Sequence, residues 1–498
     1  MNRFLLPISS LFLLLIFLFS GLGKSQTIPN KPNLQESNFD GQLILNNSSQ
    51  ELPLRLDDAV YLALQNNRDL KIAYLQRILD QKQLAETESQ FNPTFTPQLS
   101  LNFNKNQAGN NTNNDITTAL GANFNLKIPT GGNLSLTWQG QNLLSGTSSL
   151  SDTNTLSQSV NLNFSQPLLK DFGRELNTLS IKKARLTENA NVLNLKNTIS
   201  QTITNTILSY RNLLLAQERL KIEQLSFTNA KKDLERLQAL FEFGRISKND
   251  LVQRQADIAQ QEVNLVNTQS SLEQAIYELI KIIDLPTTKK LIAIETPTPP
   301  TSLNLPAFTE MLELAKTNNI GYLAAVNAVE NAKFAIAEAK NQQKLDLKLN
   351  LIYGFNSASN DQSANNIGSS LILNREFGNL SQNNTLVKSE ISLQNANYTL
   401  AKTQDNLNEE LKNKIRNVKD TFKQIELAQQ ARKLAEAKII NAKERMRLSS
   451  NISMTDIINF EKSLVDAQNQ ELNAIINHLN SITLLEQFLV ITLSKWVK

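Results

Sequence analysis

The sequence contains no cysteine and a single histidine, His478. The absence of cysteine excludes disulfide bonds, thiolate metal sites, thiol nucleophiles and lipid attachment at a cysteine. One histidine excludes most imidazole-based triads and metal clusters. The carboxylates lie scattered along predicted helices beside lysine and arginine, as on solvated faces. We therefore expect neither an enzyme nor a protein that holds a metal or another cofactor.

Proline and glycine are also scarce, with 13 and 15 in 498 residues. The last proline is Pro306, and between Arg174 and Leu285 the only helix-breaking residue is Gly244. Such stretches are typical of long helices rather than of loop-rich domains. Charged residues make up 19% of the chain and the net charge is +4, which is too mild and dispersed for a nucleic-acid binder.

No apolar run is long enough for a membrane-spanning helix, which needs about 20 residues. The longest, at 11–19, follows Arg3 and precedes Ser20, Gly21 and Gly23, which is the layout of a signal peptide. We expect a signal peptide at 1–25 and an extended segment at 26–53. A mature chain that spans a membrane would then do so with β-strands.

Short motifs recur in order along the chain and indicate a tandem duplication. Asn66-Asn67 recurs as Asn318-Asn319 at an offset of 252, and Phe172-Gly173 recurs as Phe377-Gly378 at an offset of 205. The drop in offset places about 46 extra residues in the first copy, before Phe172. We expect a first repeat at 54–284, a linker at 285–305 and a second repeat at 306–498.

Each copy is predicted to contain an opening helix, strands, a long helix, a tight turn and a closing helix. The apolar residues Leu251, Ile258 and Leu265 fall seven apart, which favours supercoiled packing of antiparallel helices. Opening and closing helices together match the long helix in length, so we expect them to lie end to end beside it. The predicted helices are 54–89, 174–243 and 248–284 in copy one, and 306–342, 382–448 and 455–497 in copy two.

Between the opening and long helices the apolar period changes to two, at about 94–165 and 346–374. Leu120, Ala122 and Phe124, for example, alternate with small polar residues. This alternation is typical of strands in a transmembrane β-barrel. One chain supplies six strands at most, and an open sheet edge cannot lie in lipid, so we expect several copies to share one barrel.

The extra residues of copy one predict two strands, 116–128 and 133–141, joined by a tight turn at 129–132. Long loops are expected on either side, at 105–115 and 143–155. The two strands either belong to the barrel or form an external hairpin.

The opening pattern from Asp58 to Asn67, the segment Gln166-Pro167-Leu168-Leu169, and the turns at 243–251 and 448–457 together resemble the TolC-type outer-membrane efflux proteins. The resemblance implies a homotrimer in the outer membrane, mainly α-helical, with a shared β-barrel and a periplasmic tunnel. Its tips would meet a periplasmic adaptor and, through it, an inner-membrane pump. The expected function is the exit duct of a tripartite efflux system. An exit duct for type I protein secretion and a structural trimeric coiled-coil surface protein are the alternatives.

The resemblance also implies two groups of site residues at the tips. The tunnel constriction is expected at Asp456, Asn459 and Ile452, where Asn459 and Ile452 replace a carboxylate and a basic residue of the family pattern. Alternatively, Asp456 is only a helix-start carboxylate following Ser453. Gly244 suits a left-handed helix end, and Ser247 with Asp250 suits a helix start. The adaptor is expected to contact Gly244, Arg245, Ile246, Ser247, Asp250, Ser450, Asn451 and Ser453.

His478 lies on the heptad seam of the last helix, one heptad after Glu471. It is either a tolerated polar residue of the seam or a pore-facing group whose charge responds to mild acid.

Overall fold

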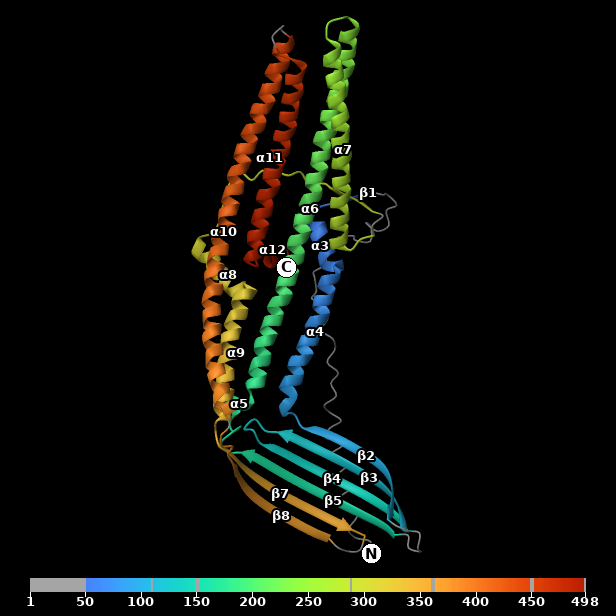
Figure 1. Cartoon of the computed structure of the whole chain (residues 1–498), viewed down its shortest axis with the longest axis vertical. Coiled ribbons are helices and arrows are strands. Elements are labelled where there is room, and N and C mark those ends of the chain that lie inside the picture. Colours follow the sequence, from blue (N-terminus) through green and yellow to red (C-terminus); the bar gives the residue numbers. More distant parts are fainter. Residues whose placement is uncertain are drawn as a thin grey trace. The chain divides into compact units, whose positions relative to one another are not determined.

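A computed structural model describes the chain at 51–108, 111–147, 153–286, 289–359, 363–378, 380–447 and 452–496. The expected signal peptide and most of the extended segment lie outside these residues. The described part is mostly helical and contains one large sheet (Figure 1). The prediction of a mainly α-helical protein with mid-chain strands is confirmed.

The two copies use the same helix order. α6 packs against both α4 and α7, and α10 packs against both α9 and α11, so opening and closing helices do share one long helix. In the described part of the chain, no helix is both long and apolar enough to cross a membrane. The helices of copy one are α3 Leu56–Asn66, α4 Arg68–Glu88, η1 Ser89–Phe91, α5 Arg174–Asn177, α6 Leu179–Glu242 and α7 Lys248–Ile283. Those of copy two are α8 Phe308–Asn318, α9 Ile320–Gln342, α10 Leu380–Arg447, α11 Met454–Phe488 and α12 Thr492–Trp496.

Each opening helix is broken in two, so the prediction of single helices at 54–89 and 306–342 is wrong. The breaks fall at Asn67 and Asn319, whose backbones are not helical. The Asn67 side chain accepts a hydrogen bond from the backbone N–H of Leu70, and Asn319 accepts one from Tyr322, each at 3.0 Å. The asparagines of the repeated motif therefore end one helix and cap the next.

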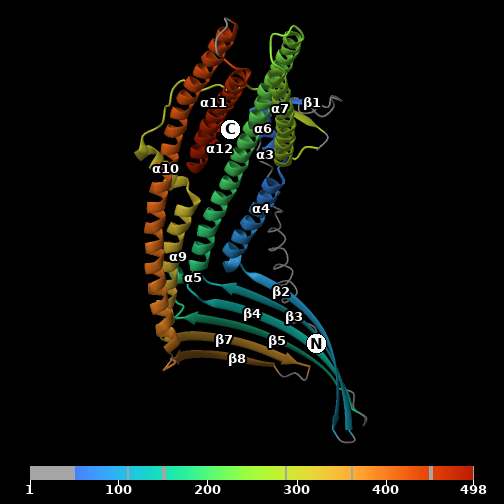
Figure 2. The same cartoon turned by 45° about the horizontal axis from the view of Figure 1, so that its top comes forward.

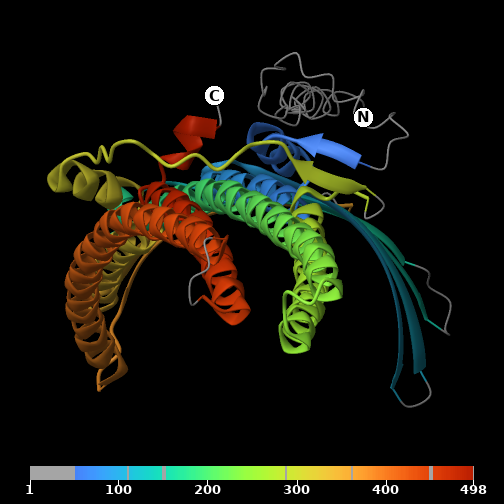
Figure 3. The same cartoon turned by 90° about the horizontal axis from the view of Figure 1, so that it is seen from above.

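Part of the heptad pattern is buried, and α6 and α7 pack along each other. Ala230 and Leu237 on α6 are buried, as are Ile258 and Leu279 on α7. Polar contacts join the copies, since Arg219 on α6 donates a hydrogen bond of 2.6 Å to Asn473 on α11. Figure 3 looks along the two hairpins, α6–α7 and α10–α11, which lie as neighbouring pairs.

Six antiparallel strands form a single curved sheet in the order β2-β3-β4-β5-β7-β8 (Figure 2). The two strands of the extra segment, β3 and β4, lie inside this sheet and not beside it. A short parallel pair, β1 Glu51–Leu54 with β6 Lys290–Ala293, lies in segments that the sequence predicted to be extended or linker. The sheet strands are β2 Thr94–Ala108, β3 Asn111–Lys127, β4 Asn133–Thr147, β5 Thr153–Pro167, β7 Asp346–Ala358 and β8 Ser363–Asn374.

The strands of copy one are longer than predicted. Most of the expected loop at 105–115 is β-ladder, which continues to the pair Ala108 and Asn111. The expected loop at 143–155 is likewise shortened, because β4 pairs with β5 as far as Ser145 and Thr153. A β-ladder is formed by backbone hydrogen bonds, which every residue type except proline can donate and accept. The paired strands therefore continue beyond the residues whose apolar alternation predicts a strand.

His478 is fully buried between α10 and α11. Its Nδ1 lies 3.1 Å from the hydroxyl of Thr421, which in turn lies 3.0 Å from the Ser481 hydroxyl. The ring also contacts Phe422, with 5.4 Å between the ring centroids. Within this chain the seam interpretation of His478 therefore holds and the pore-facing one does not.

Burial lowers the pKa of His478, although a hydrogen bond to the Val418 carbonyl opposes the shift. As the pH falls, the unfolded chain therefore binds a proton at a higher pH than the folded chain does. The free energy of unfolding falls as the pH drops below about 6.5. We expect the free energy of unfolding to decrease between pH 7.5 and pH 5.5, by at most about 1.4 kcal/mol per pH unit. Because the chain has no other histidine, His478→Gln should remove most of this slope in urea unfolding followed by circular dichroism. An unchanged slope in the variant would contradict the assignment.

Candidate functional site

The turn between α6 and α7 ends one helix and starts the next by backbone and side-chain caps. Gly244 has φ = +67°, a conformation that glycine adopts without steric cost. The Gly244 N–H donates to Phe241 O and the Arg245 N–H donates to Leu240 O, each at 2.9 Å, which satisfies the last carbonyls of α6. The predicted left-handed helix end at Gly244 is confirmed.

The next helix begins with a capping box formed by Ser247 and Asp250. The Ser247 hydroxyl accepts a hydrogen bond from the Asp250 N–H at 3.2 Å and donates one to the Asp250 carboxylate at 2.6 Å. The carboxylate also accepts from the Ser247 N–H. Arg245, which lies between the two caps, is exposed, and Ile246 is half-buried.

The α10–α11 hairpin repeats this start. The Asp456 carboxylate accepts from the Ser453 N–H at 3.0 Å and from the Ser453 hydroxyl at 2.7 Å. These hydrogen bonds lower the pKa of Asp456, which is therefore ionised at neutral pH. The helix-start role of Asp456 is thus real, and it leaves the predicted constriction role open, because one carboxylate can serve both. Ser450 and Asn451 lie outside the described residues.

The other two predicted constriction residues differ in environment. Asn459 is exposed on α11. It lies one turn after Asp456, so the two side chains are neighbours on the helix surface. Ile452 instead packs against the buried cluster of Ile439, Ala442 and Ile457. Within this chain Ile452 stabilises the α10–α11 hairpin.

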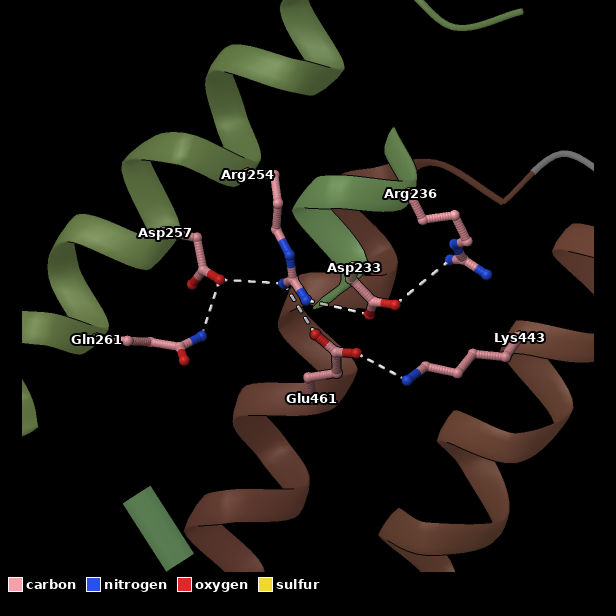
Figure 4. Close-up of polar contacts among 7 residues, drawn as sticks. All are labelled: Asp233, Arg236, Arg254, Asp257, Gln261, Lys443 and Glu461. Atoms are coloured by element: carbon pink, nitrogen blue, oxygen red, sulfur yellow. Dashed lines mark hydrogen bonds and ion pairs between the residues drawn. The ribbon is translucent and has the colours of Figure 1, made fainter. Parts of the chain in front are cut away.

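Contacts connect the two hairpins close to these helix starts. The Thr455 hydroxyl donates a hydrogen bond of 3.1 Å to the side-chain oxygen of Gln253. Next to Gln253 begins a network of charged and amide side chains from all four helices of the hairpins (Figure 4). We call it the Arg254 cluster; its members are Asp233, Arg236, Arg254, Asp257, Gln261, Lys443 and Glu461.

The Arg254 side chain, at the centre of the cluster, is only 1% exposed. Its two terminal nitrogens lie 3.3 Å from the carboxylate of Asp233 and 3.1 Å from that of Asp257. A third carboxylate, from Glu461 on α11, lies 2.9 Å away and also contacts Lys443 on α10 at 2.8 Å. Arg254 and Glu461 therefore connect copy one to copy two.

The cluster balances its charges. Three cationic and three anionic side chains take part, and none of the carboxylates is more than 25% exposed. Burial raises the pKa of Asp257, and the guanidinium of Arg254 opposes that shift. The guanidinium therefore offsets part of the cost of burying this carboxylate.

Sequence reasoning did not identify Arg254, although a signal was present. Arg254 follows Leu251 by three residues and precedes Ile258 by four, which is the second seam position of the heptad. A charge at this position is unusual, because seam positions are normally apolar. It indicates a buried partner, but the partners come from helices far away in the sequence.

Comparisons with known proteins agree with the fold. Residues 59–283 match the family described as outer membrane efflux protein. A structure of CusC, described in relation to transmembrane channel formation, is 18% identical with a TM-score of 0.66, covering 87% of this chain and 91% of that one. The Campylobacter jejuni CmeC outer membrane channel is 17% identical with a TM-score of 0.64, covering 87% and 85%. The outer membrane protein VceC of Vibrio cholerae is 16% identical with a TM-score of 0.65, covering 87% and 95%. No functionally curated protein matches the sequence.

Proposed function

We propose that three copies of this chain form an outer-membrane exit duct, because residues 59–283 match the family described as outer membrane efflux protein. In this proposal the sheets close one β-barrel, and the helices continue it as a periplasmic tunnel. The hairpin tips contact an adaptor, through which an inner-membrane pump delivers small molecules.

The six-stranded sheet is the observation that carries this proposal. It has two edge strands, β2 and β8, neither of which closes on the other within the chain. One face is apolar and open, with Leu99 74% exposed and Ile367 82% exposed. Such a face suits lipid, whereas unpaired strand edges do not. Pairing β2 of one copy with β8 of the next satisfies both requirements.

Two helices beside the sheet edges also carry open apolar residues. On α4, Ile72, Leu75 and Leu79 form one stripe, and each is more than 60% exposed. On α10, Val387 and Ile391 lie one turn apart and are about half exposed, at 51% each. α4 leads into the edge strand β2 and α10 follows the edge strand β8, so these apolar stripes support contacts between neighbouring copies.

A cysteine placed at the tip tests the proposal, because the chain has no other cysteine. We expect Arg245→Cys, labelled in intact cells with a maleimide that carries a photoreactive benzophenone, to capture a periplasmic adaptor identified by mass spectrometry. Lys388→Cys is the matched control, since it is also exposed but lies near the sheet end of α10. Light scattering of the unmodified protein in mild detergent should give the mass of three chains. A monomer, or equal capture at both positions, would contradict the proposal.

A further inference from the structure

The extra hairpin β3–β4 is an internal part of the sheet. Copy two contributes one hairpin, β7–β8, whereas copy one contributes four strands, β2 to β5. Thr94 of β2 pairs with Asn125 of β3, and Asn133 of β4 pairs with Ser165 of β5. Each ladder continues from these pairs without a break. Both strands of the hairpin therefore have a hydrogen-bonded neighbour on each side.

The turn of this hairpin is docked against the segment that leads from β5 into α6. The Gly173 N–H donates a hydrogen bond of 3.1 Å to Thr130 O, and the Gln166 amide also donates to that carbonyl. A Cβ at Gly131 would lie 2.2 Å from the backbone oxygen of Asp171, and Gly131 has φ = +99°. Only glycine allows so close an approach at this position, so the hairpin is seated at the junction of sheet and helices.

The two faces of the sheet keep their character across the extra hairpin. Residues directly paired in a sheet share a face. One row across all six strands is entirely apolar: Phe95, Phe124, Leu136, Leu162, Tyr353 and Ile367. The adjacent row, on the other face, is entirely uncharged and small or polar: Thr96, Asn123, Thr137, Asn161, Gly354 and Asn366.

From these observations we propose that β3–β4 is a wall segment that widens the membrane channel. This inference rests on the proposed function, because it needs three copies around one axis. Three six-stranded sheets give a ring of 18 strands, whereas without the extra hairpin the ring would have 12. Barrel diameter grows about linearly with strand number, so the ring is about 1.5 times as wide.

The width has a consequence for transport. With strands about 4.8 Å apart and tilted by about 40°, an 18-stranded ring measures about 36 Å between opposite backbones, and a 12-stranded one about 24 Å. The 18-stranded lumen is of the porin class. Solutes leaving the helical tunnel would therefore meet no size barrier at the membrane.

The test compares the natural protein with a hairpin deletion in which residues 109–152 are replaced by Asn-Gly, a favoured two-residue turn. This junction keeps Leu99 of β2 opposite Leu162 of β5, so apolar residues stay on one face. Electron microscopy of both proteins in lipid nanodiscs, viewed along the axis, measures the ring. We expect about 36 Å for the natural protein and about 24 Å for the deletion, a 1.5-fold difference.

The outcomes separate this inference from the proposed function. A natural ring of three chains that measures about 24 Å would place the hairpin outside the wall and overturn the inference alone. A protein that does not assemble as three chains would overturn the proposed function. If the deletion does not fold, as judged by lost helical circular dichroism, the diameter of the natural ring still decides.

Discussion

Arg254→Met is expected to lower the free energy of unfolding by about 3–5 kcal/mol, because it leaves carboxylates around a buried site without their shared cation. Asp233, Asp257 and Glu461 all contact the guanidinium, and the buried position leaves little water to replace it. Urea unfolding in mild detergent, followed by circular dichroism, measures the loss. Hydrogen exchange should rise most at the tip ends of α7 and α11, where Glu461 joins the two copies.

Two variants control for general effects of removing a charge. Arg236→Met removes the other arginine that contacts Asp233, but its side chain is 64% exposed, so the loss should stay below about 1 kcal/mol. Arg254→Lys keeps the charge without the planar fork that reaches several carboxylates, so its loss should be intermediate. Equal losses in Arg254→Met and Arg236→Met would show that the Arg254 cluster contributes no more than a surface ion pair.

The helical framework was predictable because local chemistry determines it. The hydrogen bonds that end α6 and start α7 join residues three to five positions apart. The spacing of Gly244, Ser247 and Asp250 is therefore enough to predict the turn. The repeated asparagines were recognised as a motif, yet their role in breaking each opening helix was missed. Asn67 illustrates the reason: its side-chain amide also donates to Ile282 O, 215 residues away.

Other features depend on contacts between distant segments. The Arg254 cluster draws on four helices, and no periodic pattern pairs Arg254 with Glu461. The ends of β2 and β3 continue as a ladder through asparagine-rich sequence, where no apolar alternation marks a strand. The docked turn at Gly131 depends on its close approach to Asp171, a residue of another segment that no local pattern pairs with it.

Asp456→Asn is expected to reduce the cation preference of the channel in planar bilayers, seen as a reversal potential shifted toward zero in a salt gradient. The proposed trimer places three ionised Asp456 side chains around one axis at the narrow end of the tunnel. Converging negative charges attract cations and repel anions, and salt weakens the effect.

Asp250→Asn separates the constriction role of Asp456 from its helix-start role. Both aspartates complete the same capping box, with hydrogen bonds to the preceding serine of nearly the same length. Each substitution therefore weakens one capping box. Both should lower the free energy of unfolding by a similar amount, at most about 2 kcal/mol. A reversal potential that moves in Asp456→Asn but not in Asp250→Asn supports a charge at the constriction. A reversal potential that Asp456→Asn leaves unchanged would mean that Asp456 only starts α11.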